Sequence, residues 1–149
     1  MKVPYAKCDF AAIRAQGYFY VDKTPYIPLL ENVNEDHLIF LRPRRFGKST
    51  LISMLENYYD IALTDQFDTL FGGLLIHQLP TPKRNKYLVL TIDLSPVDTG
   101  GDIKAICKSF AVQIKAAVHS FIHRYRGIVP GLSVLVPVVE SADEDMAGL

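Results

Sequence analysis

Short β-favouring runs alternate with helically spaced apolar residues along the chain, and this alternation predicts an α/β protein. Residues 37–41 form one apolar run, and residues 87–94 form a second that is apolar at nearly every position, as a buried parallel strand would be. Helical spacing follows the first run to about residues 59–61, and the longest helical pattern begins at a capping Asp102 and extends to about Tyr125. We therefore expect a partial parallel sheet flanked by helices.

Shorter elements are marked by capping residues and by turn residues. Asp9 is placed to cap a helix over residues 9–16 that Gly17 ends, and Thr24 is placed to cap a helix that begins at Pro25. Composition predicts three further segments: a β-run at 18–21, a short helical or turn segment that starts at 67–70 and is ended by two glycines, and at best an edge strand at 134–139, which contains a proline.

The loop between the first apolar run and the following helix carries the chemistry. It closes on Gly47, Lys48 and Ser49, and the order of strand, loop, Gly-Lys-Ser and helix is that of a P-loop, or Walker A motif. The first amides of a helix lack intrahelical partners and the helix dipole is positive there, so a polyphosphate can bind them. Lys48 would reach the outer phosphates, and the Ser49 hydroxyl would bind Mg²⁺. The fold class expected is therefore α/β and P-loop NTPase-like.

One position departs from the usual pattern, and a simpler interpretation stays open. Arg42 stands where the full P-loop pattern has its first glycine, and Pro43 makes the loop entry stiffer. The alternative is an ordinary helix start, at which a serine caps the helix and Lys48 is solvated.

Composition limits the partners and the compartment. The chain has 149 residues, a formal net charge of zero and 49% hydrophobic residues, with a mean hydropathy of +0.13. Zero net charge argues against broad electrostatic binding to nucleic acid or membranes. No apolar stretch is long enough to span a bilayer and the N-terminus has no apolar signal core, so we expect a cytoplasmic protein.

Neither the cysteines nor the histidines predict a metal site or a disulfide. Cys107 falls on the apolar face of the longest predicted helix, so we expect it to be buried and inert, and we expect no bond to Cys8. His119 and His123 are four residues apart, but no third ligand accompanies them.

Several stretches, in the same order along the chain, resemble one protein family. Residues 10–24, 41–55, 67–76 and 87–95 are similar to the predicted AAA-ATPase (AAA-ATPase-like) domain, and the similarity is weak after about Ser95. The segment RPRRFGKS, which ends at the Gly-Lys-Ser triplet, is highly specific to that family. The family itself carries arginine at the position of the missing glycine.

The resemblance implies a domain that binds ATP and Mg²⁺, in a family whose members often continue into a PD-(D/E)XK nuclease-like domain absent here. Asp22 and Lys23 belong to the N-terminal signature of the family. Their role stays open, and a structural role for Asp22 at the start of the next helix is an alternative to nucleotide contact. Ser49 is the candidate Mg²⁺ ligand. The candidate nucleotide-binding residues are Arg44, Arg45, Phe46, Gly47, Lys48, Ser49 and Thr50.

The chain lacks the acidic Walker B strand that the family carries, so no catalytic residue is assigned. Asp93 ends an apolar run but stands at an earlier strand of the family pattern. We interpret residues 1–139 as an incomplete P-loop domain, truncated or divergent, with an extension at 1–36 and the P-loop unit at 37–61. Residues 140–149 form an acidic tail that we expect to be disordered. Uncovered apolar surface in such a domain predicts self-association or a covering partner.

Three functions compete at this point. The first is an ATP-binding module with weak or no hydrolysis, and the second is a divergent ATPase that uses Asp93. The third is a nucleic-acid binder, which the zero net charge disfavours. The basic residues available to the third are Arg42, Arg44, Arg45, Lys83, Arg84 and Lys86.

Overall fold

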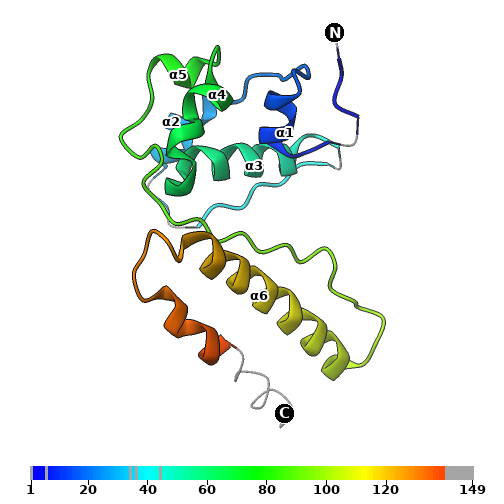
Figure 1. Ribbon diagram of the computed structural model, residues 1–149. Coiled ribbons are helices and arrows are strands. Elements are labelled where there is room, and N and C mark those ends of the chain that lie inside the picture. The colour runs from blue at the N-terminus through cyan, green and yellow to red at the C-terminus, as the bar shows by residue number, and fades with distance from the viewer. Residues whose placement is uncertain (1, 6, 34, 36, 44, 140–149) are drawn as a thin grey trace. The chain divides into compact units, whose positions relative to one another are not determined.

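Helices joined by turns and extended segments make up the part of the chain that the structure, a computed structural model, describes (Figure 1). The described residues are 2–5, 7–33, 35, 37–43 and 45–139. They fall into two compact units, residues 1–87 and residue 88 onward, and each unit is considered by itself.

The first unit begins with a helix that its own cap defines. In α1 (Phe10–Ala15), the Asp9 side chain accepts a hydrogen bond from the Ala12 amide at 3.2 Å. Gly17 has a φ of 63°, a left-handed conformation that favours glycine and ends the helix. The predicted helix at residues 9–16 and both of its end signals are confirmed.

The second helix starts later than its sequence predicts. α2 (Tyr26–Glu31) follows Pro25, and no side chain caps it. Thr24 is fully buried and its hydroxyl bonds elsewhere, so the prediction of Thr24 as the N-cap is wrong. Prediction from local sequence failed here because a long-range hydrogen bond took the hydroxyl that the cap would have used.

The core of the first unit gathers around α3 (Lys48–Tyr59), which ends where the sequence predicts. Tyr58 is fully buried, and its ring meets the Phe71 ring edge-on with centroids 5.6 Å apart. Burying such a side chain contributes about 1.5–3 kcal/mol, so this aromatic cluster fixes α3. The helices around it are η1 (Ile61–Gln66), α4 (Phe67–Phe71), which confirms the predicted helix at 67–70, and α5 (Leu75–Gln78).

The predicted α/β fold with a parallel sheet is wrong, because the described part of the chain is helical and contains no sheet. Its one β feature is an isolated parallel bridge between Asp60 and Tyr87. The apolar runs at 37–41 and 88–94 are extended but pair with no other strand of the described residues, and Leu41 is 85% exposed. Apolar composition favours strands, but a strand forms only where a neighbour accepts its backbone hydrogen bonds. The β-run expected at 18–21 forms no strand either, although the Phe19 amide donates a hydrogen bond to the Lys2 carbonyl at 2.8 Å.

The second unit is organised by α6 (Ile103–Tyr125), the helix predicted from Asp102. The Asp102 side chain accepts a hydrogen bond from the Ala105 amide at 2.8 Å, which confirms this cap. Tyr125 is fully buried, and its hydroxyl accepts a hydrogen bond from the Val89 amide at 2.9 Å. This contact ties the extended segment after Tyr87 to the end of α6.

Three predictions for the second unit are wrong. The expected edge strand at 134–139 is helical. η2 (Leu132–Leu135) is followed by one α-helical turn at 136–139, and Pro137 stands near its start, where a missing amide costs little. The run at 87–94 is not a buried strand, since Leu90 is 46% exposed. Cys107 is exposed, because none of the described residues of this unit covers it.

Much apolar surface lies open, as the 80% exposure of Ile103 illustrates, and self-association stays a prediction. The acidic tail at 140–149 lies outside the described residues. No helix in the described ranges is long and apolar enough to cross a membrane.

Candidate functional site

The loop that precedes α3 is held in a conformation that requires glycine at one position. Gly47 forms the N-cap of α3 with φ 71° and ψ 28°, in the left-handed region, and Arg45 has a φ of 68°. A side chain at position 47 would be strained by about 1–2 kcal/mol. The loop therefore enters the helix through a tight turn that glycine makes possible.

This turn leaves the first amides of α3 without helical partners. The first intrahelical hydrogen bond runs from the Leu51 amide to the Gly47 carbonyl, at 3.0 Å. The amides of Lys48, Ser49 and Thr50 precede that bond, and no side chain caps the helix. Ser49 therefore does not act as the cap that the simpler interpretation required.

The Lys48 side chain folds back over its own loop. Its ammonium donates hydrogen bonds to the carbonyl oxygens of Arg42, at 2.5 Å, and Pro43, at 3.2 Å. A lysine held in this way is not freely solvated. It closes the loop at Arg42, the position at which the P-loop pattern has its first glycine.

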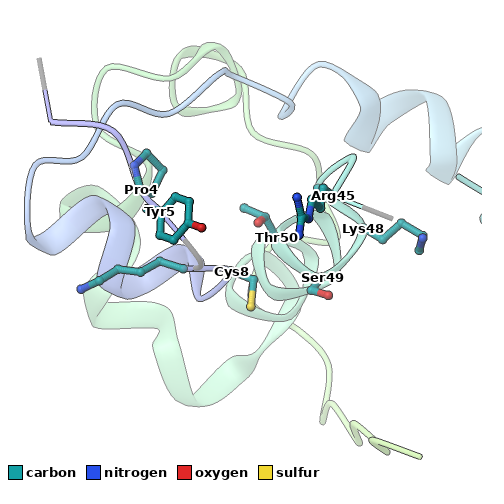
Figure 2. Close-up of a pocket in the computed structure, with 9 residues that line it drawn as sticks. Pro4, Tyr5, Cys8, Arg45, Lys48, Ser49 and Thr50 are labelled. Carbon is teal, nitrogen blue, oxygen red and sulfur yellow. The ribbon is translucent and has the colours of Figure 1, made fainter. Parts of the chain in front are cut away.

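A cleft of about 590 Å³ opens between this loop and the N-terminal segment. Figure 2 shows Tyr5 across from Arg45 and Thr50, with the Lys48 side chain extending away from Tyr5. The residues that line the cleft are Pro4, Tyr5, Lys7, Cys8, Arg45, Gly47, Lys48, Ser49 and Thr50. None of these is acidic, so the cleft carries an excess of positive charge that suits an anion.

Among the cationic residues that line the cleft, Lys7 contacts residues outside the loop that precedes α3. Its ammonium donates a hydrogen bond to the Gln16 side chain at 2.8 Å and lies 4.8 Å from the centre of the Tyr18 ring. The hydrogen bond from Lys7 lowers the pKa of the Tyr18 hydroxyl, and partial desolvation opposes it.

The structure brings most of the predicted nucleotide-binding residues to one place. Arg45 lines the cleft together with the run from Gly47 to Thr50. Phe46 is 58% exposed and is not part of the lining, and Arg44 lies outside the described residues. Whether these residues bind a nucleotide stays a prediction.

Comparison with known proteins identifies the family. The family model described as predicted AAA-ATPase matches residues 4–146. The chain belongs to this family. The match continues well past Ser95, where we had expected only weak similarity. No curated protein and no solved structure matches the chain.

Asp22 and Thr24 are built into the scaffold of the first unit. One Asp22 oxygen accepts hydrogen bonds from the Thr24 amide at 2.8 Å and the Thr24 hydroxyl at 2.7 Å. The other accepts from the Leu75 amide at 2.8 Å, and the Ile76 amide donates to the Thr24 hydroxyl at 3.2 Å. Asp22 therefore shapes the turn before α2 and also holds the start of α5.

Lys23 lies between Asp22 and Thr24, and its role was left open by the sequence. Its ammonium occupies the space in which a side chain at position 47 would begin, so it lies directly against Gly47. The sequence signal was its place in the family signature, but nothing in the sequence indicated contact with a loop 24 residues away.

The chemistry of this family member fits phosphate better than it fits a protein-bound metal. Ser49 and Thr50 offer hydroxyl oxygens at the cleft, but no carboxylate lines it. Mg²⁺ usually binds through one or two carboxylates together with substrate phosphates and water. An ion here would therefore depend on the phosphates, with Ser49 as the candidate protein ligand. No group of three metal-ligating side chains occurs in the part of the chain described.

The contacts of the remaining candidates lie within their own units. Asp93 belongs to the second unit, and its carboxylate accepts a hydrogen bond from the Ser95 amide at 2.9 Å. Hydrogen bonding from Ser95 lowers the pKa of this exposed carboxyl. Among the basic residues, Arg84 lies over the Phe67 ring at 4.3 Å and Arg42 over the Phe40 ring at 5.5 Å.

Proposed function

We propose that this chain is a nucleotide-binding module that takes ATP with Mg²⁺ at the Gly47–Thr50 turn and hydrolyses it slowly or not at all. The observation that carries this proposal is the start of α3, where the amides of Lys48, Ser49 and Thr50 have no hydrogen-bond partner among the described residues and the same residues line a positively charged cleft. Backbone amides at a helix start bind phosphate through hydrogen bonds and the helix dipole together. Membership of the predicted AAA-ATPase family supports ATP as the nucleotide.

The roles of the side chains follow from their positions. Lys48 is held by loop carbonyls and would exchange those neutral acceptors for charged phosphate oxygens, which form stronger hydrogen bonds. Arg45 adds a guanidinium at the same cleft, and Ser49 would complete the coordination of Mg²⁺. Catalysis needs a further group that orients the attacking water, and no acidic residue lines the cleft. Binding with little turnover is the result.

A calorimetric titration with ATP, with and without Mg²⁺, tests this proposal. Lys48→Ala should weaken binding tenfold or more, which is about 1.4 kcal/mol or above. Ser49→Ala should weaken binding only when Mg²⁺ is present. Lys83→Ala is the matched control, because it removes the same charge from an exposed position outside the cleft.

Two results would overturn the proposal in different ways. Wild-type protein that binds neither ATP nor GTP refutes nucleotide binding altogether. Sustained phosphate release that Asp93→Ala abolishes, with ATP binding retained, refutes the slow-turnover part and establishes the divergent ATPase instead.

A further inference from the structure

The backbone on both sides of Lys23 is fixed by hydrogen bonds. Asp22 accepts three of them, two from Thr24 and one from Leu75. Thr24 is fully buried, and its hydroxyl also accepts one from the Ile76 amide. Because both neighbours are held, the backbone that carries the Lys23 side chain has a defined position before any ligand arrives.

The Lys23 ammonium is directed at the phosphate-binding turn and is not neutralised there. The ammonium lies next to Gly47, in the space that a side chain at position 47 would fill. No carboxylate of the described residues lies within ion-pair distance of it. The carboxylate of the adjacent Asp22 is directed at Thr24 and Leu75, to which both of its oxygens are hydrogen-bonded.

We propose that Lys23 is a second phosphate-binding lysine, which makes the site selective for a triphosphate over a diphosphate or monophosphate. This inference rests on the proposed nucleotide site. Lys48 approaches the turn from α3, and Lys23 approaches it from the segment before α2, so two ammonium groups from separate elements share one loop. Each additional phosphate brings more negative charge to these cations, and the attraction grows with that charge.

The experiment compares ligands that differ in phosphate number. Wild-type protein, Lys23→Gln and Lys23→Arg are titrated with ATP, ADP, AMP and inorganic tripolyphosphate, with Lys83→Gln as the charge-matched control. Lys23→Gln should weaken ATP and tripolyphosphate binding about tenfold, as expected for one lost hydrogen bond between charged groups, and should leave AMP nearly unchanged. Lys23→Arg should retain most of the affinity.

A footprint on the wild-type protein keeps the test independent of how the variants fold. Lysine acetylation, followed by mass spectrometry, should show protection of Lys23 and Lys48 by tripolyphosphate, with Lys83 unaffected. Unchanged acetylation of Lys23 at saturating ligand overturns the inference. The inference is also overturned if folded Lys23→Gln binds all four ligands with the same affinity as the wild type, while Lys48→Ala loses affinity for ATP. Wild-type protein that binds none of the four refutes the proposed function itself, and this inference falls with it.

Discussion

Replacing Asp22 by alanine should unfold the first unit more easily, because one carboxylate joins two distant parts of it. The substitution removes three hydrogen bonds of 2.7–2.8 Å, to the Thr24 amide, the Thr24 hydroxyl and the Leu75 amide. A hydrogen bond to a charged group contributes about 1.5–3 kcal/mol net, and Asp22 is only partly buried. After allowance for solvent and for the lack of additivity, we expect a loss of about 2–4 kcal/mol in the free energy of unfolding.

Amide hydrogen exchange on the full chain measures this loss residue by residue. It suits a chain with two compact units, for which a single unfolding transition is not assured. The amides of Leu75 and Ile76, which bond to Asp22 and Thr24, should exchange much faster in Asp22→Ala than in the wild type. Asp65→Ala is the matched control, because Asp65 is exposed on η1 and its loss should change stability by no more than about 0.5 kcal/mol.

One outcome would refute this reasoning directly. If Asp22→Ala and Asp65→Ala give the same exchange rates at Leu75 and Ile76, the carboxylate does not hold α5. The fixed position of Lys23 would then lose its physical basis, even if nucleotide binding survived.

Two further predictions concern the loop and the core. Gly47→Ala and Gly73→Ala both place a side chain at positive φ, but only position 47 meets the Lys23 ammonium. Both should therefore lose about 1–2 kcal/mol of stability, while only Gly47→Ala should lower ATP affinity by about tenfold in calorimetry; equal affinities would contradict the contact. Burial raises the pKa of Tyr20 from 10.0 to about 12, so its stabilising contribution is complete below pH 10 and is lost as the pH rises toward 12. Thermal melts between pH 10 and pH 12 should show that the melting temperature falls less in Tyr20→Phe than in the wild type. Identical pH profiles of the two proteins would contradict this prediction.

The starts of α1 and α6 were predictable because their signals are local. Asp9 and Asp102 each cap a helix through an amide three residues away, and Gly17 ends one by its own conformation. Such contacts depend on neighbouring residues, which the sequence displays directly. The predicted strands did not form, because a strand depends on a pairing partner elsewhere in the chain. The runs at 37–41 and 88–94 have the right composition but pair with no strand of the described residues, and pairing of the second run stops at the single bridge of Tyr87 to Asp60.

In the candidate site, too, the local features were predictable and the long-range contact was not. The Gly47 turn and the Lys48 position follow from a contiguous pattern, so the sequence located the loop. The placement of Lys23 against Gly47 depends on the hydrogen bonds that link Asp22 and Thr24 to α5, some 50 residues later. No local pattern encodes that approach, which is why the role of Lys23 stayed open until the fold was known.

The central claim is that the unpartnered amides at the start of α3 bind phosphate, and a nuclear magnetic resonance titration of ¹⁵N-labelled protein with Mg²⁺ and ATP tests it most directly. The account predicts that the amide signals of Gly47, Lys48, Ser49 and Thr50 shift most and saturate together. Shifts confined to the second unit, or no saturable shift in this loop, would contradict it.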